Sequence, residues 1–418
     1  MKTTVLYLDH TAKAGGAEFC MLRLLGALDP ARVRPIVVFA DEGAAPEMFR
    51  AAGLETHVIP LSGEIREVRK DTLGGPAFLH PGRALALGSY ALRIRRFAKE
   101  RGAGIIHTNS MKAHFYGGAA GRLAGIPVLW QIRDFIDTSY LPWPAVRLVR
   151  LLARSVPSHV VAPSQSVMDK IQSGTGREGR RSGENFSVVH DGLGESDLGD
   201  APAPEAPGAP AAEWRLPVRV GIVGRLAAWK GQHIFVQAAA KLLKAGHQAK
   251  FLVIGAPLFG EHSYEEELRQ MAVSLGIAEH VEFLGFRRDV GAVMRTLDIL
   301  VHASTSADPF PNVILEGMAL GLPIVGSNGG GVPEMIVDGE SGRLSPMGDA
   351  GGLARSLESY LRDPAGAKAI GRAGSIRVRQ HFTAARSARE IEEIYGRLCR
   401  YTSARSPSSA GPVGCGSR

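Results

Sequence analysis

The feature that most constrains this fold is a pattern of short apolar runs alternating with longer helical stretches, which occurs twice along the chain. In the first half the runs are rich in β-branched residues. Several are apolar at consecutive positions, as expected of parallel strands covered on both faces. They are VLYL (5–8), PIVVFA (35–40), THVIP (56–60), GIIHT (104–108), PVLWQI (127–132), HVVAP (159–163) and SVVHD (187–191). Helical stretches such as 88–102 supply the crossovers between them.

The second occurrence follows a break in composition at GDAPAPEAPGAPAAEW (199–214), which is rich in Ala and Pro and typical of an exposed linker. The strands predicted after it are VRVGIVG (218–224), KFLVIG (250–255), VEFLGF (281–286), DILVHAS (298–304) and PIVGS (323–327). The pattern predicts an α/β protein with two doubly wound, Rossmann-like domains. Ligands of such sheets bind at the carboxyl ends of the strands, so we expect the two domains to face each other across a ligand-binding cleft.

The domain limits follow from the same pattern, and 418 residues exceed what one ordinary core accommodates. We predict a first Rossmann-like domain at 1–195, the linker at 196–216 and the second domain at 217–385. An amphipathic helix is expected at 386–402. The remaining residues, 403–418, are small and polar, and we expect them to be disordered.

The overall composition indicates a globular protein of the cytoplasm. Hydrophobic residues make up 45% and charged residues 22% of the chain, as in soluble proteins. No apolar run approaches the roughly 20 residues of a membrane-spanning helix. The start, MKTTVLYLDH, favours a first strand over a signal peptide. Three widely spaced cysteines form neither a disulfide framework nor a zinc site, which fits a reducing compartment.

The net charge of +8 favours an anionic partner, such as a nucleotide or a phospholipid surface. Aromatic residues make up only 6% of the chain and are not interleaved with basic ones, so we expect no nucleic-acid partner. The chain has no Asp-x-Asp, no His-x-x-x-His and no clustered cysteines. We therefore expect no metal ion and no cofactor.

Two acids in SADPFPNVILEGMALGLPIVGS (306–327) require an explanation. Asn312 is placed to cap a helix that ends near Gly321. Asp308 precedes this helix and Glu316 lies one turn inside it. The apolar residues around them indicate a helix packed on several sides, which is costly for a carboxylate unless it is paired or binds a ligand.

Cations and glycines stand in other strand-to-helix turns. In GIVGRLAAWKGQH (221–233), Arg225 and Lys230 offer a planar fork and a point charge suited to a diphosphate, although a solvated basic loop explains them equally well. In TAKAGGAEF (11–19), Gly15 and Gly16 open a helix whose N-terminus favours an anion, but such a pair is more often a plain turn. The glycine-rich turn at 328–342 leaves the same two alternatives.

Together and in this order, these motifs resemble the retaining GT-B glycosyltransferases of family 4, also described as glycosyl transferases group 1. The likeness rests on the acid-x7-acid of DPFPNVILE, the following GMALGLPIVGSNGGGVPEMI, and GRLAAWKG, GGAE and HDG (190–192). It spans nearly the whole chain. Each motif alone is weak, and their common order is what makes the likeness specific.

The resemblance implies a nucleotide-sugar donor site in the second domain. Glu316 would accept hydrogen bonds from the ribose hydroxyls, and Asp308 would hold hydroxyls of the donor sugar. Arg225 and Lys230 would bind the diphosphate, which makes them and Asp308 the catalytic residues. The donor-binding set implied is Gly15, Gly16, Arg225, Lys230, Asp308, Phe310, Asn312 and Glu316.

Three departures from the family pattern bear on specificity. Asp308 stands where glutamate is usual, and Pro311 replaces a common glycine and removes one amide donor. Arg133 stands where many members carry a histidine. The acceptor side would include Arg133 with the residues His107, Asn109 and Asp134, although a strand-end histidine with satisfied hydrogen bonds is the more common explanation of His107.

The segment LPWPAVRLVRLLARS (141–155) places Arg147, Arg150 and Arg154 on one helical stripe among apolar residues. Such a face could rest on anionic headgroups, as a peripheral protein on the inner face of the membrane. A crossover helix with its arginines in water explains the stripe as well. On the membrane interpretation, a lipid-linked sugar acceptor becomes attractive.

The leading hypothesis is a metal-independent, retaining hexosyltransferase. It would move a hexose from a nucleoside diphosphate sugar to a hydroxyl acceptor, a glycan or a lipid-linked sugar, in surface polysaccharide, lipopolysaccharide or glycolipid assembly. One alternative is a GT-B-fold nucleotide-sugar epimerase. The other is a protein that binds a nucleotide sugar without turning it over.

Overall fold

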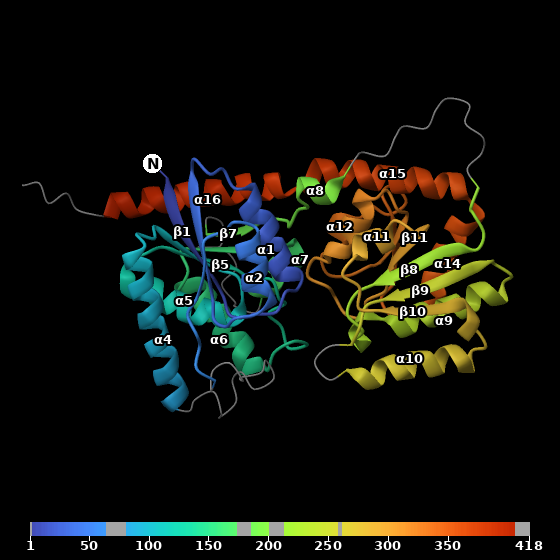
Figure 1. Cartoon of the computed structure of the whole chain (residues 1–418), viewed down its shortest axis with the longest axis horizontal. Coiled ribbons are helices and arrows are strands. Elements are labelled where there is room, and N and C mark those ends of the chain that lie inside the picture. Colours follow the sequence, from blue (N-terminus) through green and yellow to red (C-terminus); the bar gives the residue numbers. More distant parts are fainter. Residues whose placement is uncertain (1, 64–80, 174–184, 200–212, 258–260, 406–418) are drawn as a thin grey trace, which may run out of the picture. The chain divides into compact units, whose positions relative to one another are not determined.

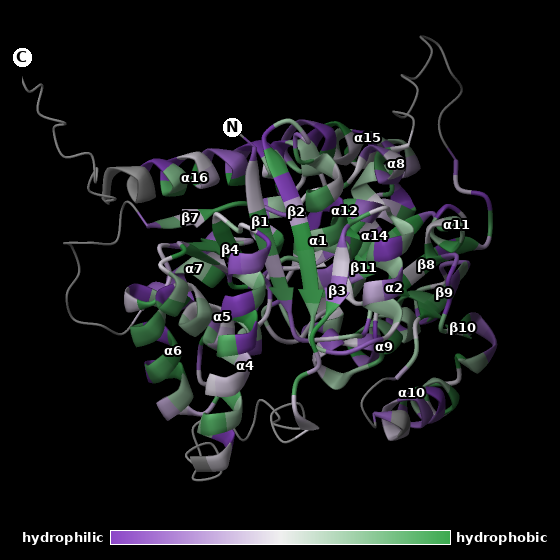
Figure 2. Cartoon of the chain, turned by 60° about the vertical axis from the view of Figure 1, so that its left-hand side comes forward, coloured by the Kyte–Doolittle hydropathy of each residue, from purple (hydrophilic) through white to green (hydrophobic). Residues whose placement is uncertain are grey.

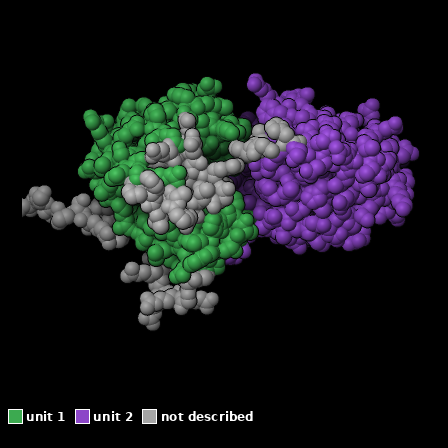
Figure 3. All heavy atoms as spheres, turned by 90° about the horizontal axis from the view of Figure 1, so that it is seen from below, with its two compact units in different colours: residues 1–161, 171–187, 388–418 green, residues 162–170, 188–387 purple. Residues whose placement is uncertain are grey.

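The computed structural model describes residues 2–63, 81–173, 185–199, 213–257 and 261–405 (Figure 1). The chain divides into two compact units, coloured separately in Figure 3. The first unit comprises Met1–Val161, Ile171–Ser187 and Ala388–Arg418, and the second comprises Ala162–Lys170 and Val188–Ser387.

The first unit is built on a seven-stranded sheet in the order β3-β2-β1-β4-β5-β6-β7. Its strands are β1 (Thr3–Asp9), β2 (Val33–Phe39), β3 (Thr56–Val58), β4 (Ile105–Thr108), β5 (Val128–Gln131), β6 (His159–Ala162) and β7 (Phe186–Val188). The helices along this part of the chain are α1 (Gly16–Ala27), α2 (Ala44–Ala51), α4 (Pro81–Glu100), α5 (Met111–Ala124), α6 (Trp143–Ser155) and α7 (Gln165–Gln172). All seven strands predicted for this half are confirmed.

The second unit has a six-stranded sheet in the order β10-β9-β8-β11-β12-β13. Its strands are β8 (Val218–Val223), β9 (Ala249–Ile254), β10 (Val281–Gly285), β11 (Ile299–His302), β12 (Ile324–Ser327) and β13 (Arg343–Ser345). The five predicted strands are confirmed. Strand β13 was not predicted, because its three residues, RLS, contain no apolar run.

Helices and short 3-10 turns connect the strands of the second unit. They are α8 (Glu195–Leu198), η3 (Ala228–Lys230), α9 (Gln232–Lys244), α10 (His262–Ser274), η4 (Ala278–His280), α11 (Val290–Met294), α12 (Asn312–Ala319), α13 (Val332–Met335), α14 (Ala350–Arg362) and α15 (Pro364–His381). The last helix, α16 (Ala384–Arg405), then leads back to the first unit. Neighbouring strands of both sheets are parallel, as in Rossmann-like domains.

The two sheets are buried on both faces, which explains their continuous apolar runs. Residues Val5–Leu8 of β1 and Ile299–Val301 of β11 are fully buried. The hydropathy colouring shows β2 as a largely green arrow in Figure 2. Because side chains alternate between the two faces of a strand, such runs require helices on both sides of each sheet.

The unit limits differ from the predicted domain limits at both crossovers. Ala162–Lys170, which the prediction put in the first domain, belongs to the second unit: Ser164 Oγ donates to the Pro309 carbonyl at 2.8 Å. The predicted helix at 386–402 packs on the first unit from Ala388 on, where Glu392 accepts from Arg32 at 2.7 Å. Local sequence patterns define elements, whereas these assignments depend on contacts between distant segments.

Two further predictions concern the segments outside the sheets. Most of the predicted linker and most of the predicted disordered tail lie outside the described residues, although α16 continues to Arg405. Within the described part of the chain, no helix is long and apolar enough to cross a membrane.

Candidate active site

In the second unit the candidate residues gather where the strand order reverses, between β8 and β11. The two strands are paired in parallel, so their carboxyl ends lie side by side. Lys230 stands in η3, just after β8, and Asp308 in the loop after β11. Lys230 Nζ donates to Asp308 Oδ2 at 2.5 Å. The sequence pointed to both residues as ligand-binding groups, but it contained no sign that they pair with each other.

The Asp308 carboxylate is held from two sides in a nearly water-free setting. Its side chain is 8% exposed, and His302 Nε2 lies 3.4 Å from the same Oδ2. Ser304 Oγ lies 3.0 Å from that ring nitrogen. Burial by itself raises the pKa of Asp308, but Lys230 and His302 outweigh it and hold the pKa well below its usual range. Burial lowers the pKa of His302, so its ring is neutral.

The glycine-rich turn after β12 packs directly against the backbone of the Asp308 loop. Gly331 N donates to the Asp308 carbonyl at 2.9 Å. Gly330 has φ +64°, and a Cβ there would lie 2.0 Å from that carbonyl oxygen, so no larger residue fits. This turn therefore holds the carboxylate loop in place, a task the sequence did not single out.

Another glycine brings Lys230 to this loop. Gly231 follows η3 with φ +73°, and a Cβ there would lie 1.9 Å from the Ala303 carbonyl oxygen. The close approach seats the turn after β8 against the strand that leads to Asp308. The Lys230 ammonium also lies 4.2 Å from the centroid of the Trp229 ring, a cation–π contact.

Arg225 lies directly after β8, one residue beyond Gly224. Its Nη1 is 3.4 Å from Glu261 Oε2, and both side chains are partly exposed. Arg225 and Lys230 therefore leave the same strand end, as predicted, and each contacts an acid in this structure.

Helix α12 carries Glu316 at a half-buried position, above fully buried Ile314, Leu315 and Met318. The helix begins at Asn312, and Pro311 occupies the cap position without a side-chain hydrogen bond. The prediction that Asn312 caps the helix is therefore wrong by one residue, because Pro311 adopts the extended conformation that precedes a helix. Phe310 is buried, 7% exposed, beside this turn.

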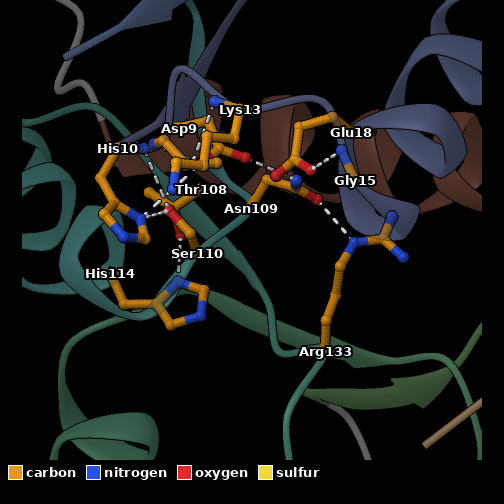
Figure 4. Close-up of polar contacts among 11 residues, drawn as sticks. Asp9, His10, Lys13, Gly15, Glu18, Thr108, Asn109, Ser110, His114 and Arg133 are labelled. Atoms are coloured by element: carbon orange, nitrogen blue, oxygen red, sulfur yellow. Dashed lines mark hydrogen bonds and ion pairs between the residues drawn. The ribbon is translucent and has the colours of Figure 1, made fainter. Parts of the chain in front are cut away.

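In the first unit, Gly15 and Gly16 stand at the start of α1, where Gly15 N donates to Glu18 Oε2 at 2.8 Å (Figure 4). Glu18 is only 6% exposed. Burial and the nearby charge of Asp9 raise the pKa of Glu18 to about 7. Glu18 was not among the predicted site residues, although an acid three residues after a helix cap has the spacing of a capping box.

A second polar chain lies beside this loop, at the carboxyl ends of β1, β4 and β5. Arg133 Nε donates to Asn109 Oδ1 at 2.7 Å, and Asn109 Nδ2 donates to Asp9 Oδ2 at 2.8 Å (Figure 4). Asp9 and Asn109 are buried. The predicted pair Asn109 and Arg133 is thus brought together, and Asp9 is the member that the sequence missed. Asp134 instead accepts from Tyr140 Oη at 2.7 Å.

Of the two explanations of His107, the assignment to the acceptor side is wrong and the strand-end histidine with satisfied hydrogen bonds is confirmed. Its side chain is fully buried in the first sheet. Both ring nitrogens are engaged, Nδ1 with Tyr395 Oη at 2.6 Å and Nε2 with Gln131 Oε1 at 3.0 Å. Burial lowers its pKa to about 3. His107 is a satisfied core histidine and has no surface to offer an acceptor.

Across the described ranges, no group of three or more His, Cys, Asp and Glu side chains is arranged to hold a metal ion.

The family described as Glycosyl transferases group 1 matches residues 217–377, and the one described as Glycosyltransferase Family 4 matches residues 14–182. The chain belongs to glycosyltransferase family 4, group 1. Its two parallel-sheet Rossmann-like units are those of GT-B glycosyltransferases.

Among solved structures, this family 4 chain is similar to HepE of Anabaena in complex with UDP and glucose. The TM-score is 0.74 at 25% identity, covering 94% of this chain and 99% of HepE. The sucrose-phosphate synthase of Thermosynechococcus elongatus has the same fold, with a TM-score of 0.71 at 19% identity over 96% of this chain and all of that one.

Among curated relatives, the lipopolysaccharide core biosynthesis mannosyltransferase LpcC of Rhizobium leguminosarum is 32% identical over 52% of this chain and 62% of its own length. The D-inositol 3-phosphate glycosyltransferase of Corynebacterium efficiens is 31% identical over 42% of each chain. The matched region thus spans less than two thirds of either relative.

Proposed function

We propose that this protein is a hexosyltransferase that moves a sugar from a nucleoside diphosphate sugar to a hydroxyl acceptor, with retention of the anomeric configuration. The observation that carries the proposal is the Lys230–Asp308 pair beside Arg225, at the switch point of the second sheet. Such a place binds ligands in open α/β sheets. The likeness to HepE, which was solved with UDP and glucose, supports a nucleotide-sugar donor there.

In this mechanism the second unit binds the donor. Arg225 and Lys230 hold the diphosphate and stabilise the negative charge that grows as the glycosidic bond breaks, without a metal ion or a cofactor. Glu316 accepts hydrogen bonds from the two ribose hydroxyls, since the two oxygens of a carboxylate suit a diol. Asp308 accepts hydrogen bonds from hydroxyls of the sugar, and the backbone amides near Phe310 and Asn312 donate hydrogen bonds to it.

The first unit supplies the acceptor side. Gly15 and Gly16 open α1, whose N-terminus favours an anion, and the chain of Arg133, Asn109 and Asp9 orients the acceptor. The departing phosphate oxygen takes the proton of the acceptor hydroxyl on the face where the new bond forms, so configuration is retained. We propose a glycan or lipid-linked acceptor, because LpcC is described as acting in lipopolysaccharide core biosynthesis.

We further propose that α6 rests on an anionic membrane, on its cytoplasmic side. Trp143 and Leu151 are more than 60% exposed on its outer face, and the Arg147 guanidinium lies over the Trp143 ring. Arg150 and Arg154 donate to carbonyls of Ile136 and Gln172, so only part of the predicted basic stripe faces outward. An aromatic and aliphatic face edged by arginine is typical of interfacial helices.

The experiment that tests the donor site is thermal unfolding with UDP, GDP, ADP, TDP and CMP. A ligand at about 100 times its dissociation constant adds about 2.7 kcal/mol to the free energy of unfolding. We expect one diphosphate to stabilise the wild type and not Glu316→Ala. Glu267→Ala, an exposed acid on α10, is the matched control and should behave as the wild type. No response to any nucleotide would overturn the proposal.

Product analysis separates transfer from the alternatives. With the stabilising donor and an acceptor extract, a transferase forms a glycosylated product and releases the nucleoside diphosphate. An epimerase would instead change the configuration of the sugar without needing the acceptor. A protein that only binds the nucleotide sugar would leave it unchanged.

A further inference from the structure

The two residues that the proposed function assigns to different parts of the donor are bonded to each other. Lys230 is expected to hold the diphosphate and Asp308 the sugar, yet Nζ and Oδ2 lie 2.5 Å apart. The side chains are 22% and 8% exposed, so little water screens the pair. Neither residue can make its full set of donor contacts until this ion pair is rearranged.

We propose that the Lys230–Asp308 ion pair is a latch that the donor opens. The diphosphate takes over the lysine, and the released carboxylate, positioned by His302, then accepts the hydroxyls of the sugar. This inference rests on the proposed function, because it concerns the same donor site.

Electrostatics explains why a nucleoside diphosphate sugar breaks the Lys230–Asp308 ion pair, and why the ion pair forms again when only the nucleoside diphosphate remains. Once a diphosphate binds Lys230, the buried Asp308 carboxylate loses its cation and faces a second anion, which is costly in a setting of low exposure. Sugar hydroxyls supply the hydrogen-bond donors that the carboxylate then needs. A nucleoside diphosphate without a sugar supplies none. After transfer, Asp308 therefore recovers Lys230 and favours release of the diphosphate.

His302 is the positioning residue of this exchange. Its Nε2 lies 3.4 Å from Asp308 Oδ2 and 3.0 Å from Ser304 Oγ, a position from which the ring keeps the carboxylate in place when the lysine leaves. The Asp308 backbone is fixed as well, through Gly331 N. The latch thus has one mobile partner, the flexible lysine, and one fixed partner.

The decisive experiment measures the affinity of UDP, or of the diphosphate selected by the unfolding test, for the wild type and for Asp308→Asn. The latch predicts that Asp308→Asn binds the diphosphate about tenfold more tightly, although it transfers sugar at least a hundredfold more slowly. In a Lys230→Ala background, where no ion pair has to be broken, the same substitution should tighten binding by a smaller factor. A residue that only contacts the sugar would leave diphosphate affinity unchanged, and that result would overturn the latch.

Controls keep this inference separate from the proposed function. If the wild type binds no nucleoside diphosphate, the proposed function itself fails; if it binds one and Asp308→Asn binds no tighter, only the latch fails. Asp308→Ser carries the same prediction should Asp308→Asn not fold. If both variants fail to fold, the pair is a structural element and the inference is wrong.

A second pair of variants tests His302. His302→Asn retains an N–H donor, whereas His302→Leu does not. We expect His302→Leu to lower kcat about tenfold with diphosphate affinity within twofold of the wild type, and His302→Asn to recover most of the rate. Equal losses in rate and in affinity would overturn the positioning role.

Discussion

The two units place polar clusters at the same position in the same kind of sheet, yet the electrostatics of the clusters are opposite. In the second unit a cation and an anion pair directly, and the pKa of Asp308 is held below its usual range. In the first unit two acids lie close together, and the pKa of Glu18 is raised to about 7 by burial and by Asp9. Asp308 in the second unit therefore keeps its negative charge near neutral pH, whereas the cluster of the first unit contains a carboxyl that titrates there.

The largest effect should come from removing the donor-side cation. We expect Lys230→Ala to lower kcat by about 10² to 10³, as loss of one preorganised charge-stabilising group does elsewhere. Lys244→Ala, which removes an exposed lysine at the end of α9, should leave kcat unchanged. Steady-state kinetics with the donor sugar measures both. A decrease in kcat of less than about threefold for Lys230→Ala would contradict a charge-stabilising role of Lys230.

The second prediction concerns the free energy of unfolding in mild acid. We expect it to decrease as the pH falls, mainly because of buried histidines in the first unit. Burial lowers the pKa of His107 and His114 to about 3 and that of His159 to about 4. Between these values and the unfolded value near 6.5, the unfolded chain binds more protons, so stability drops as the pH falls. We expect a loss of roughly 1.5 kcal/mol per histidine between pH 6.5 and 5.

The raised pKa of Glu18 acts in the opposite direction and offsets about one histidine, because the folded state holds its proton up to about pH 7. Urea unfolding at both pH values measures the net loss. His107→Gln should reduce it, whereas the control Lys244→Ala, which removes no histidine, should not. Equal pH dependence in all three proteins would contradict the assignment.

A third, smaller effect should appear in the pH dependence of the acceptor step. With a pKa of about 7, the charged fraction of Glu18 rises from about a tenth at pH 6 to about nine tenths at pH 8. If charged Glu18 orients the acceptor hydroxyl, kcat/KM for the acceptor rises up to about ninefold over this range in the wild type. The same profile measured for Glu18→Gln should be flat, and an unchanged profile would exclude Glu18.

The smallest effect tests the specificity of Arg133. Lysine retains the charge but cannot reproduce the Nε bond to Asn109. We expect Arg133→Lys to raise KM for the acceptor about threefold to tenfold, with donor affinity unchanged. Arg122→Lys, on α5, is the control. A matching rise in the donor KM would place Arg133 on the donor side instead.

Most of the fold was predictable because it is encoded locally. Parallel strands covered on both faces leave consecutive apolar residues, and those runs located twelve strands. Strand β13 was not predicted because its pairing with β12, and not its composition, makes it a strand. Asn312 was misplaced for a related reason, since the sequence offers two adjacent residues at the helix start and only the backbone decides between them.

The sequence predicted which residues belong to the candidate site, but not which of them contact each other. Arg225, Lys230, Asp308 and Glu316 were identified from residue type and position after strands. The sequence could not distinguish a buried, satisfied His107 from an accessible one, because its partner Tyr395 lies 288 residues away. Glu18 was missed because its unusual pKa depends on burial and on Asp9.

The sequence by itself determined the two Rossmann-like units, the order of their strands along the chain and the residue types at the strand ends, since apolar periodicity and turn residues act over a few positions. Only the tertiary structure decided which of these residues meet. Lys230 and Asp308 are 78 residues apart, and Gly231 and Gly330 allow the close backbone approaches that seat their loops. Pairing of charges is a property of distance and burial, and both are set by packing.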